Sequence, residues 1–186
     1  MKEHYAFALP GEYGAFKLVR IGNKVGLRDK VGNLVCPIKY SIIYHFVDGL
    51  SIVKIKHSHE QYQWGIINQK GEERLFLGNY QEMKVLNRKV IAVKCWGHWG
   101  LIDKFERFIC DFKYDKCPSS YINGFSKVIR NELYAFIDES GRQICAAKYT
   151  EVGDFDGYGQ VDVKRDGHCY RMNKKGVELK SGRKKC

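Results

Sequence analysis

Two kinds of residue return along this chain at nearly the same interval, and this repetition limits what the chain can fold into more than any other feature. The first marker, a tyrosine, recurs at spacings of 35, 40, 34 and 35 residues. The second, a turn-forming aspartate or asparagine, recurs at spacings of 39, 35, 35 and 35. A shared period in this range predicts tandem structural units. The markers are Tyr5, Tyr40, Tyr80, Tyr114 and Tyr149, and Asp29, Asn68, Asp103, Asp138 and Asn173.

Short runs of alternating apolar and polar residues predict several β-strands in each copy. In residues 161–164, for example, two valines alternate with Asp162 and Lys164, so that one face of the strand is buried. Between such runs lie dipeptides that accept the positive φ of tight hairpin turns. These dipeptides are Asp48-Gly49, Asn123-Gly124 and Asp156-Gly157.

A second type of strand is predicted from Trp-Gly followed by two aliphatic residues, as at Trp64-Gly65 and Trp99-Gly100. A tryptophan covers ~150–250 Å² and can bridge to the next copy. The glycine has no Cβ, so a neighbouring backbone or ring can approach closely. The strand ends in Asp-x-x-Gly or Asn-x-x-Gly, in which the polar side chain accepts a hydrogen bond from the backbone two residues on. Glu106 replaces the turn glycine in the third copy, which predicts strain or a different turn there.

The pattern Trp-Gly-(Leu/Ile)-Ile-(Asp/Asn)-x-x-Gly, followed by an apolar strand, Lys-Tyr and an Asp-Gly turn, resembles the bacterial WG-repeat (β-repeat) family. The similarity covers roughly residues 5–180, and the Lys-Tyr element is present at residues 39–40, 113–114 and 148–149. The resemblance implies a repeat fold and no particular reaction, because the family is defined by its repeat. Departures from the pattern are Val25, Glu106, Tyr134 and Cys169.

The expected fold is all-β, with one domain over residues 1–180 made of five tandem antiparallel units of about 35 residues. The units are expected at residues 5–38, 40–77, 80–111, 114–146 and 149–180. We expect them to stack as an open, twisted β-solenoid, and the alternative is a closed five-bladed β-propeller. Atypical end copies favour the open form. So does the short period, compared with the ~40–45 residues of a WD40 blade.

Composition and charge predict the nature of the C-terminal tail, the cellular location and the state of the cysteines. The net charge is +11, and four basic residues lie in the last seven positions, so residues 181–186 are predicted to be a basic disordered tail. No apolar run approaches the ~20 residues of a membrane span. The beginning lacks an apolar signal region, which makes the cytoplasm the default location. Seven cysteines without a Cys-x-x-Cys pair predict reduced thiols.

No catalytic residue, cofactor or metal site is predicted. The chain contains no Gly-x-Ser-x-Gly, phosphate-binding loop, dinucleotide fingerprint or His-Glu-x-x-His. Asp29, Asp103 and Asp138 share one repeat position, which indicates turn formation rather than acid–base chemistry. Cysteines at a second shared position, residues 36, 110 and 145, are interpreted as small core residues. The loop at residues 57–60 has metal-ligand types but no fixed partner, so it does not predict a metal site.

The leading hypothesis is a non-enzymatic scaffold that binds a protein or peptide across its regularly spaced loops. The sequence leaves the oligomeric state open. Partner contacts are predicted at His57, His59, Tyr62, Trp96 and Tyr121. The alternative is a nucleic-acid-binding module with a basic face and interleaved aromatic residues, using the tail. Its predicted contacts are Lys180, Arg183, Lys184 and Lys185.

Overall fold

The computed structural model describes residues 4–5, 16–58, 61–179 and 184–185, and its strands form small antiparallel sheets. No helix and no closed barrel occur in this part of the chain, so the all-β prediction is confirmed. Among these residues, therefore, no helix is long and apolar enough to cross a membrane.

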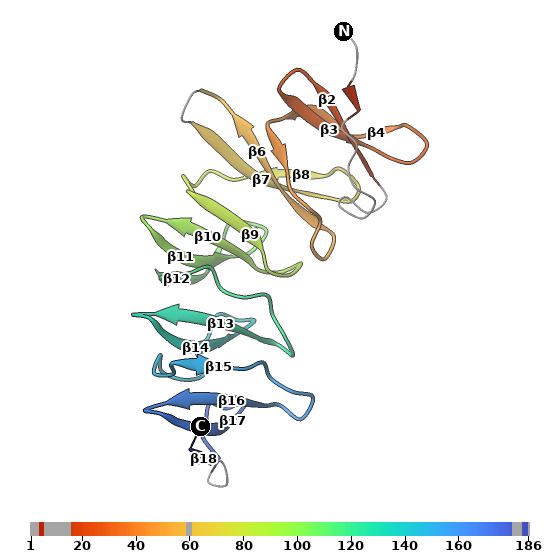
Figure 1. Cartoon of the computed structure of the whole chain (residues 1–186). Coiled ribbons are helices and arrows are strands. Elements are labelled where there is room, and N and C mark those ends of the chain that lie inside the picture. The colour runs from red at the N-terminus through yellow and green to blue at the C-terminus, as the bar shows by residue number, and fades with distance from the viewer. Residues whose placement is uncertain (1–3, 6–15, 59–60, 180–183, 186) are drawn as a thin grey trace.

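Five sheets follow one another along the molecule (Figure 1). The first contains β1 (His4–Tyr5), β2 (Lys17–Ile21), β3 (Lys24–Arg28) and β4 (Leu34–Tyr40). The second contains β5 (Ile42–Ile43), β6 (Leu50–Lys56), β7 (Tyr62–Asn68) and β8 (Glu73–Leu75). The third contains β9 (Glu82–Val85), β10 (Ile91–Cys95), β11 (His98–Ile102) and β12 (Phe108–Tyr114). The fourth contains β13 (Phe125–Arg130) and β14 (Leu133–Asp138). The fifth contains β15 (Glu151–Val152), β16 (Gln160–Arg165), β17 (His168–Asn173) and β18 (Lys184–Lys185).

Neighbouring sheets bury their facing side chains against each other, in four clusters within the described residues. Trp64 packs with Val93 between the second and third sheets, and Trp99 packs with Val128 between the third and fourth. The indole Nε1–H of Trp64 also donates to the backbone oxygen of Tyr80 at 2.7 Å. The expectation that tryptophan bridges to the next copy is therefore confirmed.

The glycines after Trp64 and Trp99 let the next strand lie against the backbone. A Cβ on Gly100 would lie 2.9 Å from the backbone oxygen of Cys110 and 3.0 Å from Cδ1 of Phe112. A Cβ on Gly65 would lie 2.6 Å from the backbone oxygen of Arg74 and 2.8 Å from Cδ2 of Leu75. In the fourth sheet the matching residue is Ala135, and there the following segment makes only isolated bridges to β14. The segment still bonds to β14, since the backbone N–H of Ile144 donates to the oxygen of Phe136 at 3.0 Å.

The recurring Asp and Asn residues form the predicted turns. Oδ1 of Asp103, for example, accepts hydrogen bonds from the backbone N–H groups of Phe105 at 2.7 Å and Arg107 at 3.0 Å. The other four copies repeat the arrangement. Glu106, which stands in place of glycine, has a φ of 66°, so the predicted strain is present. Its carboxylate offsets that strain by accepting bonds from the N–H groups of Leu77 and Gly78, at 2.9 and 2.7 Å.

The outer face of the fifth sheet is polar. It carries Asp162, Cys169 and Arg171 where the second sheet directs apolar side chains toward its neighbour. Arg171 pairs with Asp162 at 3.1 Å and also with Asp156. A polar outer face is expected of a terminal copy in a repeat stack. The matching residues of the second sheet are Ile52, Trp64 and Ile66.

Two expectations about the C-terminal region differ from the structure. Lys184 and Lys185, expected in a disordered tail, form β18 and pair with Cys169 and His168 of β17. Pairing satisfies backbone groups along the edge of β17. Residues 181–183 and 186 lie outside the described part. Cys169 is disulfide-bonded, so the prediction of reduced thiols is wrong there, because a disulfide depends on proximity in space rather than on spacing.

The core interpretation of the three recurring cysteines is confirmed. Cys36 and Cys110 are buried, and Cys145 packs against two of the clusters. Burial raises the pKa of the Cys36 thiol to about 11, which keeps it protonated and unreactive at neutral pH.

Gly100→Ala should lower the free energy of unfolding by about 1–3 kcal/mol, because its methyl group would displace the backbone of Cys110 and the ring of Phe112. Gly157→Ala is the control, since a Cβ there meets nothing within 4 Å. Urea unfolding followed by circular dichroism measures both. Equal stability of the two variants would contradict the role given to the glycine.

Candidate functional site

Trp96 occupies a backbone position that does not suit it. The β10–β11 hairpin turns at Trp96 and Gly97, whose φ angles are 49° and 84°. A two-residue turn of this kind favours Asn, Asp or Gly, and the matching residues in three other hairpins are Gly22, Asn131 and Asp166. The Trp96 side chain is also 82% exposed. Neither burial nor backbone preference explains a tryptophan here, which makes Trp96 a candidate for the functional site.

Trp96 begins a row of three aromatic side chains, Trp96, Phe112 and Phe108, which we call the aromatic ridge. The ring centroids of Trp96 and Phe112 are 6.0 Å apart, and those of Phe112 and Phe108 are 5.8 Å apart. Both pairs meet edge to face, a favourable geometry for aromatic rings. Phe112 is anchored over Gly100, whereas Phe108 is 66% exposed. The ridge therefore follows edge strand β12 from the hairpin tip toward the preceding turn.

A group of cations lies near the other end of the ridge. Phe105 is half-exposed, and its ring centre lies 4.9 Å from the guanidinium of Arg74, 5.1 Å from Nζ of Lys104 and 5.1 Å from the guanidinium of Arg107. We call these four residues the cation cluster. Arg74 comes from β8 of the second sheet, and the others come from the turn before β12. The cluster thus forms only where two sheets stack.

The other predicted contact residues do not join this ridge. His57 is exposed, with its Nε2 3.2 Å from Oε1 of Gln63. Tyr62 is half-buried under Lys54, whose Nζ lies 4.0 Å from the ring centre. Both lie in the β6–β7 hairpin of the second sheet, whereas Trp96 lies in the β10–β11 hairpin of the third. His59 lies outside the described residues.

Tyr121 is a half-buried residue at the edge of the core. It packs against the cluster between the third and fourth sheets, and its hydroxyl donates to the backbone oxygen of Asp138 at 3.2 Å. Of the tail residues, Lys184 and Lys185 lie in β18, and Lys180 and Arg183 fall outside the described part. Among the predicted contacts, Trp96 alone belongs to the exposed aromatic row.

Sequence reasoning missed Phe105 and Phe108, although a signal was present. Phe108 stands two residues after the turn position, where the second, fourth and fifth copies carry Glu73, Gln143 and Glu178. A phenylalanine where other copies carry a polar residue is the sign of an exposed aromatic side chain. Arg74 had no such signal, because its neighbour Phe105 comes from another copy.

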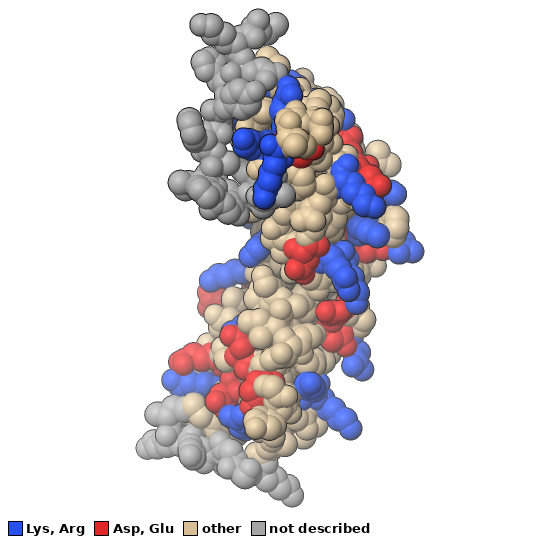
Figure 2. All heavy atoms as spheres, turned by 90° about the vertical axis from the view of Figure 1, so that its right-hand side faces the viewer, with Lys and Arg blue, Asp and Glu red and all other residues tan. Residues whose placement is uncertain are grey.

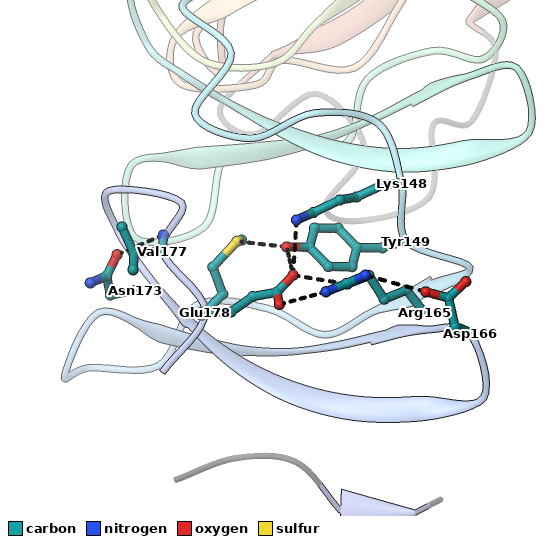
Figure 3. Close-up of polar contacts among 8 residues, drawn as sticks. Lys148, Tyr149, Arg165, Asp166, Asn173, Val177 and Glu178 are labelled. Carbon is teal, nitrogen blue, oxygen red and sulfur yellow. Dashed lines mark hydrogen bonds and ion pairs between the residues drawn. The ribbon is translucent and has the colours of Figure 1, made fainter. Parts of the chain in front are cut away.

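A dense cluster of polar contacts surrounds Glu178, shown in Figure 3. Its carboxylate lies 2.9 Å from Nζ of Lys148, accepts a bond from the Tyr149 hydroxyl at 2.9 Å, and pairs with Arg165 at 3.1 Å. The hydrogen bond from Arg165, aided by Lys148 and Tyr149 against the effect of burial, lowers the pKa of Glu178 to about 2. Every charged group in this cluster has a partner within it.

The same arrangement recurs between the first and second sheets, which identifies it as structural. Lys39 lies 2.8 Å from a carboxylate oxygen of Glu73, and the Tyr40 hydroxyl donates to the same group. The Lys-Tyr pair at the start of a copy is thus held by the glutamate two residues after the turn glycine of that copy. We call this contact the latch.

The latch is absent between the third and fourth sheets. Gln143 takes the glutamate's position and donates instead to the backbone oxygen of Cys145 at 2.7 Å. No ion pair joins Lys113 to a carboxylate within the described chain. The same residues include no group of three His, Cys, Asp or Glu side chains placed to hold a metal ion.

Stability should fall at acid pH as the fifth-sheet latch is lost. The folded pKa of Glu178, about 2, lies below its ordinary 4.5, so its contribution is complete above about 4.5 and disappears as pH falls toward 2. Glu178→Gln should therefore cost on the order of 1–2 kcal/mol near neutral pH, allowing for solvent screening, and progressively less below about pH 4.5. Urea unfolding at several pH values tests this. Glu139→Gln, at an exposed ion pair with Lys89, is the control, and the same pH dependence in both variants would contradict the assignment.

Gln143→Glu should restore the missing latch by giving Lys113 and Tyr114 a carboxylate. We expect a gain of about 1 kcal/mol, or a rise in Tm of about 2–4 °C. Gln69→Glu adds the same charge at an exposed turn residue and serves as the control in calorimetry. Equal Tm values for the two variants would contradict the latch.

Comparison with known proteins identifies the repeat. The family described as WG containing repeat matches residues 26–56, 99–134 and 134–167, together more than half of the chain. Each match begins in the strand that carries Trp-Gly or the residues that replace it, and continues into the next sheet, so the sequence repeat is offset from the hydrogen-bonded sheet. No curated protein matches the chain.

Among solved structures, the chain is similar to a protein described as TolB from Agrobacterium tumefaciens. The identity is 11% and the TM-score 0.42, over 92% of this chain and 79% of that one. The three family matches carry the assignment: the chain belongs to the family of proteins built from the WG containing repeat.

Proposed function

We propose that this chain is a non-enzymatic protein-interaction module that binds a protein or peptide at the aromatic ridge. The observation that carries the proposal is Trp96, which is held at positive φ and is 82% exposed. Exposed aromatic side chains dominate the binding energy of many interfaces. A residue that costs stability at the surface is retained for function more readily than for folding.

The proposed scaffold is an open, twisted stack of five units rather than a five-bladed propeller. Five sheets share four buried clusters within the described residues, whereas a closed ring would need a fifth cluster between its first and last sheets. The first and fifth sheets also lie at opposite ends of the molecule (Figure 1). Such a stack supports a long, fixed surface on which one unit can present a binding site.

The nucleic-acid alternative has less support. Figure 2 shows basic and acidic side chains intermixed along the face it presents, with other residues between them, and not a continuous basic stripe. Nucleic-acid binding usually depends on many clustered cations. The cytoplasmic location remains a prediction from the sequence, and the disulfide of Cys169 is a bond that a reducing compartment disfavours.

Trp96→Asn separates binding from folding. Asparagine accepts positive φ, so the variant should be as stable as wild type or up to about 1 kcal/mol more stable. Without the ring, it should lose the partner. Affinity capture from native extract, followed by mass spectrometry and compared with wild type, measures this loss.

Tyr158→Asn is the matched control. Tyr158 is 93% exposed in a turn of the fifth sheet, away from the ridge, so its variant should retain every captured protein. Capture of the same proteins at the same yield by Trp96→Asn would overturn the proposed site.

A further inference from the structure

The cation cluster holds positive charge that the fold itself does not use. Arg107 is committed to the Asp103 carboxylate at 2.6 Å. Arg74 and Lys104 are exposed, and no ion pair joins either of them to a carboxylate of the described residues. Both lie about 5 Å from the centre of the same half-exposed ring. Two uncommitted cations on one aromatic ring make a site with both charge and an apolar surface.

This site is fixed in position by the strained turn. Glu106 has positive φ, and its carboxylate accepts the N–H of Leu77 at 2.9 Å, the N–H of Gly78 at 2.7 Å and the hydroxyl of Tyr80 at 3.0 Å. These bonds tie the turn that carries Phe105 to the segment that follows Arg74. The cluster is thereby held across two sheets.

The cluster and the aromatic ridge are close enough to bind one partner. Phe105 and Phe108 are three residues apart, so their Cα atoms are separated by at most ~11 Å. Leu77, which is 92% exposed, lies beside the same turn through its bond to Glu106. An extended peptide advances ~3.3 Å per residue, so a segment of a few residues reaches from the ridge to Arg74 and Lys104.

We infer that the partner presents an acidic peptide segment, whose apolar side chain packs on the ridge while its carboxylates bind Arg74 and Lys104. This inference rests on the proposed function. Arginine binds a carboxylate through two parallel hydrogen bonds, which adds specificity to the charge attraction. A nucleic acid is less well suited, because two free cations neutralise few phosphates of a long polyanion.

A randomised twelve-residue peptide library displayed on phage provides the probe. Peptides selected on wild type are synthesised with a fluorescent label, and their binding is measured by anisotropy against variants of the full chain. Arg74→Glu/Lys104→Glu removes the proposed charge partners. Lys30→Glu/Lys174→Glu is the matched control, since it changes the net charge equally and both lysines follow the Asp or Asn of a turn in other sheets.

Selected peptides should combine an aromatic or aliphatic residue with a surplus of Asp and Glu. Their affinity should fall at least about tenfold in Arg74→Glu/Lys104→Glu, stay within about twofold in the control, and weaken as salt rises. Peptides that need Trp96 but are neutral or basic, or that ignore the charge reversal, would overturn the acidic partner and leave the ridge in place. Absence of any peptide whose binding depends on Trp96 would overturn both. Labelled single-stranded DNA is measured in the same way. Binding of this DNA to wild type that is lost in Trp96→Asn would favour a nucleic-acid partner and would also overturn the inference.

Discussion

Burial between neighbouring sheets is the interaction on which this molecule depends. A single sheet of two or four short strands cannot hide its apolar faces, and it is stable only when another sheet covers it. A tryptophan such as Trp64 or Trp99 removes ~200 Å² from water, worth roughly 5 kcal/mol at ~25 cal/mol per Å² before the cost of ordering it. The glycine after the tryptophan then sets how closely the neighbouring strand approaches. The latch, where it is present, joins neighbouring sheets.

The fold could be predicted from the sequence because each copy uses the same residue types for the same strands and turns. Period-two alternation, Trp-Gly and the Asp or Asn turn predicted strands, close approach and hydrogen-bonded turns, and all three are present. The fourth sheet was harder to foresee. Ala135 stands there in place of the glycine, and the following segment makes only isolated bridges to β14. No periodic pattern in the sequence predicts this irregular pairing.

The candidate site was accessible only in part, for a reason that lies in the repeat itself. Trp96 stood out because no other copy has a tryptophan in that turn. Phe105 and Arg74 become neighbours only when two copies stack, so their relation is a property of tertiary structure. Tyr121 lies in a loop and also packs against the core, a contact that its loop position alone does not predict. Departures from a repeat thus mark candidate sites, and contacts between copies complete them.

The offset between sequence repeat and sheet also bears on how such chains change in length. Each matched segment starts in the strand with Trp-Gly or its replacement and runs into the next sheet, so it carries the second part of one sheet and the first part of the following one. If one whole segment were duplicated or deleted, the first part of a sheet would still be followed by a second part, and each sheet would still pack against a neighbour. Lineages can therefore lengthen or shorten the protein by single steps, with the added layer free to diverge as the one bearing Trp96 has done.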